Sequence, residues 1–247
     1  CVVQNLFPKI RRILLKALVP EIYWPIKVDL DGVQVPVRGM PLNFGTKYWL
    51  KKGEYEQDER HLITKVLRPG LKVLEMGGSI GVLAQIIGEK VGPKGRVLSF
   101  EASERLVEIS TEMWPLMPQL QRVKGFVFPV NNGENIFVGE FQTEGSELDG
   151  RGIWELRDGM PGNTWDLRSI RKEFNFDPEI LIVDIEGGES IFDAIPPDFP
   201  DNLQSVIMEF HPHIYGIDGQ ARLEEKIIEC GFSLVDRSGQ CVLFVRT

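Results

Sequence analysis

The segment Val73–Gly81 constrains the fold more than any other part of the chain. It reads Val-Leu-Glu-Met-Gly-Gly-Ser-Ile-Gly, which is an apolar strand ending in a carboxylate, a glycine-rich turn and the start of an amphipathic helix. The glycines let the backbone turn sharply and come close to a ligand, and the helix offers unpaired N–H groups and the positive end of its dipole. We therefore predict an α/β fold with a ligand-binding loop at this turn.

Two acids beside the loop indicate the kind of ligand. Glu75, at the strand tip, would repel a pyrophosphate but suits the ammonium or sulfonium region of S-adenosylmethionine. Twenty residues beyond Gly81, a second predicted strand, Arg96–Glu101, again ends in an acid, which can take both ribose hydroxyls. NAD-binding folds share this spacing, but the glycines do not follow the order G-x-G-x-x-G. The residues predicted to bind S-adenosylmethionine are Glu75, Gly77, Gly78, Ser79, Gly81, Glu101 and Ala102.

The charge of the chain bears on its partners. Its 247 residues carry a net charge of -8, with a pI near 5.1. This argues against a protein that holds nucleic acid mainly through phosphate contacts. We expect a small-molecule or glycan acceptor and no nucleic acid.

Cysteine use and hydropathy indicate the compartment. Cys1, Cys230 and Cys241 form no C-x-x-C pair and no disulfide framework, which favours a reducing compartment. No apolar run reaches the roughly 18 residues of a membrane span. We expect a cytoplasmic protein.

Residues 1–52 are predicted to form an N-terminal extension to a domain at 53–247. Residues 6–18 place apolar side chains on one helical face and basic ones elsewhere. This pattern favours packing on the domain or on a partner subunit, and contact with an anionic membrane surface uses the same pattern. Residues 26–30 and 33–37 alternate around Asp31-Gly32, which predicts a β-hairpin.

From residue 71 onwards, predicted strands and helices alternate, as in α/β proteins. Residues 123–128 are predicted as a further strand, and 131–163 as hairpins or loops that form a lid. Only four residues separate the predicted strands 232–236 and 241–246, so these must be antiparallel, because a parallel crossover needs a dozen residues or more. The predicted fold is a Rossmann-like, seven-stranded, mostly parallel sheet with a reversed C-terminal hairpin strand.

Polar residues follow two apolar strands that are predicted neighbours. Asp184 and Glu186 follow one, and Glu209 and His211 end the other. Ligands of doubly wound sheets sit outside the carboxyl ends of the strands, so these groups are predicted to converge there. We assign Asp184, Glu186 and His211 as catalytic residues, with His211 as the general base. A hydrogen-bonded structural role for His211 stays open. We assign no metal site, although Glu209, His211 and His213 with Asp184 are residue types that ligate divalent ions.

The motifs together resemble the FkbM-type family of Rossmann-like, S-adenosylmethionine-dependent methyltransferases. The resemblance runs from about Gly53 to Glu209 and rests on Leu74–Gly81, Asp184–Glu189 and Met208-Glu-Phe-His211. It implies O-methylation of a hydroxyl on a sugar, glycan, glycolipid or natural product, with Tyr55 and Glu56 closing over the cofactor. The lysine that the family commonly has two residues before the aspartate is Ile182 here.

Two other functions remain as alternatives to an O-methyltransferase. One is a cofactor-binding or scaffold module of the same fold that has lost catalysis. Ile182 and the basic helix favour this alternative. The other is an NAD-dependent oxidoreductase, against which the glycine order and the reversed hairpin both argue.

Overall fold

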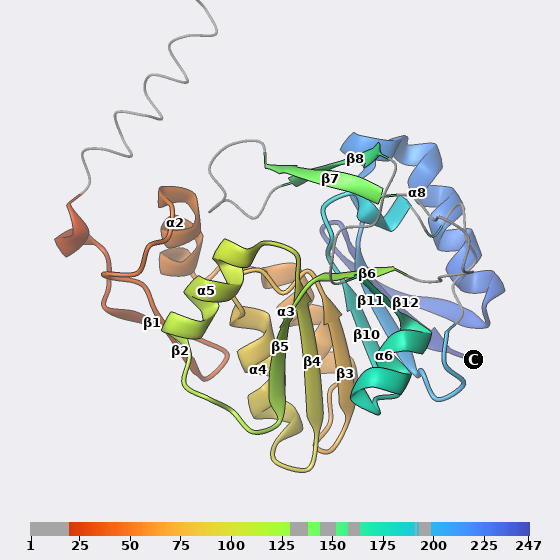
Figure 1. Cartoon of the computed structure of the whole chain (residues 1–247), viewed down its shortest axis with the longest axis horizontal. Coiled ribbons are helices and arrows are strands. Elements are labelled where there is room, and N and C mark those ends of the chain that lie inside the picture. The colour runs from red at the N-terminus through yellow and green to blue at the C-terminus, as the bar shows by residue number, and fades with distance from the viewer. Residues whose placement is uncertain (1–19, 129–137, 144–151, 158–163, 191, 193–198) are drawn as a thin grey trace, which may run out of the picture. The chain divides into compact units, whose positions relative to one another are not determined.

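The computed structural model describes residues 20–128, 138–143, 152–157, 164–190, 192 and 199–247 (Figure 1). The chain forms two compact units, Cys1–Tyr55 and Glu56–Thr247. The helix predicted over residues 6–18 lies outside the described residues. No helix among the described residues is long and apolar enough to cross a membrane.

The first unit contains the predicted hairpin. Strands β1 (Lys27–Leu30) and β2 (Val33–Pro36) pair antiparallel around Asp31-Gly32, where both residues have positive φ angles. The hairpin is preceded by the short helix η1 (Glu21–Tyr23) and followed by α2 (Phe44–Lys52). Asn43 caps α2 by accepting the Thr46 N–H at 2.9 Å.

The second unit is built on a seven-stranded sheet in the order β12-β13-β11-β10-β3-β4-β5. The strands β10, β11, β3, β4 and β5 run parallel, and β13 is antiparallel to both of its neighbours. The predicted sheet with its reversed hairpin strand is therefore confirmed. The strand bounds are β3 (Lys72–Met76), β4 (Arg96–Glu101), β5 (Leu120–Lys124), β10 (Ile180–Val183), β11 (Ser205–Glu209), β12 (Phe232–Ser238) and β13 (Cys241–Arg246).

Helices cover both faces of this sheet. They are α3 (Gln57–Val66), α4 (Val82–Val91), α5 (Glu104–Met113), α6 (Leu167–Phe174) and α8 (Pro212–Glu229), with the short η2 (Gly188–Ser190) after β10. In Figure 1, α3 and α4 lie behind the sheet and α6 lies in front of it. This arrangement leaves the carboxyl ends of the parallel strands to carry the loops.

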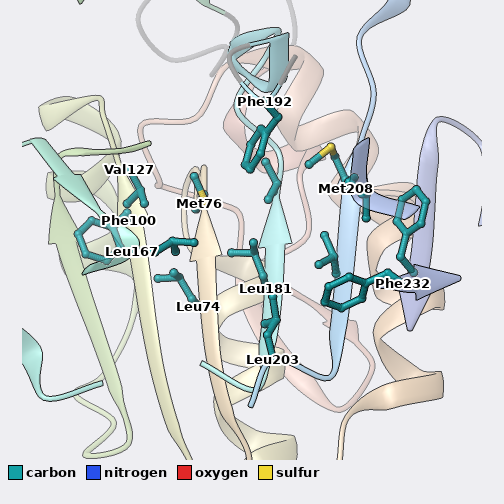
Figure 2. Close-up of a cluster of buried hydrophobic side chains, with 14 of the residues drawn as sticks. Leu74, Met76, Phe100, Val127, Leu167, Leu181, Phe192, Leu203, Met208 and Phe232 are labelled. Atoms are coloured by element: carbon teal, nitrogen blue, oxygen red, sulfur yellow. The ribbon is translucent and has the colours of Figure 1, made fainter. Parts of the chain in front are cut away.

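A hydrophobic core lies between the sheet and the helices α6 and α8. Figure 2 shows it spanning the sheet from Phe100 on β4 to Phe232 on β12, with Leu74, Leu181 and Met208 on the strands between. Because side chains alternate along a strand, the residues between these, such as Glu75, face the helices on the other side. The same alternation therefore fixes which polar side chains can meet.

The strand predicted over 123–128 is wrong in its bounds. Gly125, with φ of 153°, separates β5 from β6 (Phe126–Phe128), and β6 pairs with β9 (Thr164–Asp166) outside the main sheet. Within 131–163, β7 (Val138–Thr143) and β8 (Gly152–Arg157) form an antiparallel hairpin, as predicted. The remainder of that segment lies outside the described residues.

Candidate functional site

The glycine-rich loop joins β3 to α4 and is held by its neighbours. The N–H groups of Gly77 and Gly78 both donate to the Phe100 carbonyl at 2.9 Å. Gly77 has a φ of 89°, and a Cβ there would lie 1.6 Å from the carbonyl oxygen of Asp184. Only glycine fits this position, and its contact with Asp184 places the loop beside the end of β10.

A row of polar side chains crosses three strands beneath the loop. The sheet register aligns Glu75 with Ser99, and Ser99 with Arg122. Arg122 donates to Ser99 Oγ at 2.8 Å and to the Gly78 and Ser79 carbonyls at 2.7 and 2.5 Å. Sequence reasoning missed Arg122, because it lies mid-strand and the register that brings it to the loop depends on how β5 pairs.

Glu75 points into this row. Its side chain is 2% exposed, and Oε2 accepts from Ser99 Oγ and lies 3.8 Å from Arg122. Oε1 is buried and has no hydrogen-bond partner among the described residues. Burial raises the pKa of Glu75, while Arg122 and Ser99 act in the opposite direction. Glu75 thus supports the loop through Ser99 and Arg122. Its direct contact with a ligand stays a prediction.

Glu101 ends β4 beside the loop. Its Oε2 accepts the Ser79 N–H and its Oε1 the Ser103 N–H, both at 2.7 Å. Burial raises the pKa of Glu101, and these two bonds with Arg122 oppose that shift. An ionised carboxylate offers about four lone-pair sites, so each oxygen retains one for a further donor. Ala102 follows in the chain and precedes the cap of α5.

Glu56 contacts the same loop region from another side. Its Oε2 accepts the N–H of Leu83 at 3.1 Å, in the first turn of α4. Tyr55 belongs to the first unit. A cofactor contact by either residue stays a prediction.

A second polar cluster lies where β10 and β11 end. His211 Nε2 is 3.8 Å from Asp184 Oδ1 and 3.5 Å from Glu186 Oε2. The structure thus brings together the three residues predicted to be catalytic. Because Asp184 also contacts Gly77, this cluster adjoins the glycine-rich loop.

Glu189 orients the histidine. Its Oε1 lies 3.2 Å from His211 Nδ1 and accepts the Ile185 N–H at 3.1 Å, and its side chain is fully buried. Glu189 lies within η2, and its side chain faces inward. Burial lowers the pKa of His211, but Glu189, Glu209 and Glu186 outweigh it and leave the pKa raised. His213 is exposed.

Glu209 meets a buried acid that the sequence did not single out, Glu59 on α3. Burial and the hydrogen-bonded Glu59 raise the pKa of Glu209 to about 8. Burial, with Glu209 and Glu59, also raises the pKa of Asp184 well above its usual value. Glu209 therefore holds a proton at neutral pH that an isolated carboxyl group would lose.

Comparison with known proteins bears on the loop and its row of polar residues. A family model described as protein-L-isoaspartate(D-aspartate) O-methyltransferase matches residues 59–137. That range contains the glycine-rich loop, Glu75, Glu101 and Arg122. The match and the sheet order agree on the kind of fold. The chain has the fold of the class I methyltransferases that use S-adenosylmethionine.

Individual relatives match the chain over limited parts. A protein-L-isoaspartate O-methyltransferase of Methanothrix thermoacetophila is 50% identical over 44 residues, which is 18% of this chain and 21% of that protein. The chain thus matches about a fifth of that relative's length.

Solved structures also resemble the chain. Aeropyrum pernix fibrillarin with bound S-adenosylmethionine is 13% identical, with a TM-score of 0.45 over 72% of this chain and 67% of that one. A Methanococcus jannaschii fibrillarin, titled a pre-rRNA processing protein, is 12% identical, with a TM-score of 0.43 over 72% and 66%. A Thermotoga maritima S-adenosylmethionine-dependent O-methyltransferase is 13% identical, with a TM-score of 0.44 over 78% and 65%.

These findings correct one expectation and leave another unproven. A small-molecule or glycan acceptor and no nucleic acid were expected, and this is wrong: the matches are named for protein isoaspartate and for pre-rRNA processing. Net charge misled here because it does not report where charge is placed. The matched family model is also not that of the FkbM-type family, so membership of that family is not shown.

The loop and Glu101 fit the cofactor of the class. The absence of a side chain at Gly77 lets the loop lie against the backbone of Asp184, at the carboxyl end of β10 where ligands of this fold bind. The remaining lone pairs of Glu101 match two ribose hydroxyl donors. When bound, S-adenosylmethionine supplies an electrophilic methyl group. Glu101 and the loop would hold it.

We expect the stability of the metal-free protein to fall as pH rises from 5 to 9. The folded pKa of Glu209 is about 8, above its ordinary value of 4.5, so between these values the folded state binds more protons than the unfolded state. This contribution is full below pH 4.5 and lost as pH rises through 8. Glu209→Gln should reduce the loss of stability between pH 5 and pH 9 by on the order of 2 kcal/mol.

Chemical denaturation at pH 5, 7 and 9 in the presence of EDTA measures this effect. The amide of the variant donates to Glu59 at every pH, as the protonated acid does. The raised pKa of His211 also makes stability fall as pH rises. This effect is present in the unaltered protein and in Glu209→Gln alike, so it cancels in the comparison. If the free energy of unfolding falls with pH equally in the unaltered protein and in Glu209→Gln, Glu59 and Glu209 share no proton.

Proposed function

We propose that this methyltransferase transfers the methyl group to a hydroxyl oxygen of its acceptor, with His211 as the general base. Asp184 and Glu186 position the hydroxyl. One observation carries the proposal: His211 Nε2 lies within 4 Å of both carboxylates while Nδ1 is bonded to Glu189, beside the loop of the cofactor.

The bond to Glu189 sets the tautomer that base catalysis needs. With its proton on Nδ1, donated to Glu189, neutral His211 presents a lone pair at Nε2. That lone pair accepts the hydroxyl proton as the oxygen attacks the methyl carbon, and the C–S bond breaks. The surrounding carboxylates stabilise the imidazolium that results. A positioned base of this kind contributes typically 10²–10⁴-fold.

Charge at the cluster favours a neutral acceptor. Beside His211 lie the acids Asp184, Glu186, Glu189 and Glu209, with Glu59 behind them. A carboxylate acceptor would add a further negative charge to this group, and like charges at close range are costly. A hydroxyl adds none. The FkbM-type motif in the sequence supports the same kind of acceptor.

The family model favours a second candidate, methylation of an isoaspartyl carboxylate in a protein. The product distinguishes the two, because an isoaspartyl carboxylate yields a methyl ester and a hydroxyl yields a methyl ether. Mild base hydrolyses the ester to methanol and leaves the ether intact. The stability of the transferred methyl group therefore reports the acceptor class.

The test uses S-adenosylmethionine labelled in the methyl group. Label is measured on an isoaspartyl peptide, its aspartyl counterpart, an RNA oligonucleotide and its 2′-deoxy counterpart, before and after mild base. We expect base-stable label, and a 10²–10⁴-fold lower kcat for His211→Gln with unchanged S-adenosylhomocysteine affinity. His213→Gln, which changes the exposed neighbour, is the matched control and should retain kcat.

Base-labile label on the isoaspartyl peptide would reject the hydroxyl acceptor. Equal kcat values for His211→Gln and His213→Gln would reject the base. Intact binding of S-adenosylhomocysteine with no transfer to any acceptor would favour a module that has lost catalysis.

A further inference from the structure

Three electron-pair acceptors face one another at the end of β10 and β11. When the Nδ1 proton of neutral His211 is donated to Glu189, Nε2 carries a lone pair. That lone pair faces Asp184 Oδ1 and Glu186 Oε2, which are also acceptors. Asp184 Oδ1 is buried and has no hydrogen-bond partner among the described residues. Such an arrangement is unfavourable unless a proton or a metal ion lies between the atoms.

The separations suit a metal ion better than direct hydrogen bonds. Nε2 lies 3.8 Å from Asp184 Oδ1 and 3.5 Å from Glu186 Oε2, beyond the usual 2.7–3.2 Å of an N–H···O bond. Two ligands bound to one ion at about 2.1 Å are roughly 3.0–3.8 Å apart. Glu209 completes the set, since ligand atoms of Asp184, Glu209 and His211 all lie within 4.8 Å of one another.

The surroundings of His211 are those of a metal-bound histidine. Such histidines almost always donate their other ring N–H to a carboxylate or carbonyl, which fixes the ring and its tautomer. Glu189 provides this, and it is itself fixed by the Ile185 N–H and fully buried. The imidazole is thus held with Nε2 toward the carboxylates before any ion arrives.

We propose that Asp184, Glu209 and His211 bind a divalent transition-metal ion, such as Mn²⁺ or Zn²⁺, with Glu189 orienting the imidazole. One imidazole nitrogen with carboxylate oxygens is a ligand set for these ions, whereas Ca²⁺ requires six to eight oxygens. His213, the other histidine of this segment, is not part of the set. The site draws its ligands from the ends of two neighbouring strands.

The ion and the proton are alternative occupants of Nε2. A bound ion takes the lone pair that base catalysis would use, and it lowers the pKa of a coordinated hydroxyl instead. Metal binding is therefore measured without S-adenosylmethionine or acceptor, so that its failure is independent of the proposed methyl transfer.

The test is a titration of Mn²⁺ into the EDTA-treated and dialysed full chain, followed by calorimetry and by EPR. We expect saturable binding of one ion, with pulsed EPR showing coupling to one imidazole ¹⁴N. Asp184→Asn, Glu209→Gln and His211→Gln should each weaken binding at least 10-fold. Glu189→Gln should weaken it about 10-fold through the histidine orientation. His213→Gln should bind Mn²⁺ as the unaltered chain does.

The ¹⁴N coupling needs no variant, so the proposal can fail even if the variants do not fold. Absence of saturable Mn²⁺ and Zn²⁺ binding at millimolar concentration would overturn it. Saturable binding without nitrogen coupling, or with equal affinity in folded His211→Gln, would place the ion elsewhere and overturn it too. Ca²⁺ should not compete.

Discussion

Replacing Gly77 with alanine is expected to abolish S-adenosylhomocysteine binding and to lower the free energy of unfolding by at least about 3 kcal/mol. The added Cβ would lie 1.6 Å from the Asp184 carbonyl oxygen, a backbone atom that cannot rotate away. The loop and the end of the strand must therefore separate, which displaces the glycine-rich loop and Asp184 together. Calorimetry with S-adenosylhomocysteine and urea denaturation measure the two effects.

Gly70→Ala is the matched control. Gly70 lies in the turn before β3 with a φ of 90°, almost the 89° of Gly77, but a Cβ there meets nothing within 4 Å. Both variants place alanine at a positive φ, which costs on the order of 1 kcal/mol. Only Gly77→Ala also brings its Cβ into collision with the Asp184 carbonyl oxygen. If the two variants lose similar stability and affinity, the approach of the loop to β10 is not what requires glycine.

The sequence predicted most of the fold because its signals are local. The Val73–Gly81 motif, the alternation of strands and helices, and the four residues between the last two strands each determine structure within a few residues. The error at 123–128 has the same origin. Gly125 divides a segment that reads as one strand, and the partner of β6 is β9, about forty residues away.

The candidate site was predicted only in part, because its remaining members come together through the register of the sheet. Asp184, Glu186 and His211 follow strand ends, which the sequence marks. Arg122 and Glu59 lie inside a strand and a helix, and their roles appear only when β5 pairs with β4 and α3 packs near β11. No spacing rule connects Glu59 to Glu209.

Arg122→Met is expected to cost about 3–5 kcal/mol of stability and to weaken S-adenosylhomocysteine binding at least 10-fold. The substitution removes the donor to the Gly78 and Ser79 carbonyls and leaves Glu75 buried without its cation. Protonation of Glu75, whose pKa burial already raises, limits the loss. Lys124→Met, on the same strand and paired with Glu104 at the surface, should change stability by less than about 0.5 kcal/mol.

The double variant Glu75→Gln/Arg122→Met separates the two roles of the arginine. Removing the acid as well should restore part of the stability, because no unpaired buried charge remains. It restores no donor to the loop carbonyls, so binding of S-adenosylhomocysteine should stay weak. Recovery of affinity along with stability would mean that Arg122 acts only as the counter-ion of Glu75. Stability regained without affinity would instead establish that the guanidinium holds the loop in the shape that the cofactor requires.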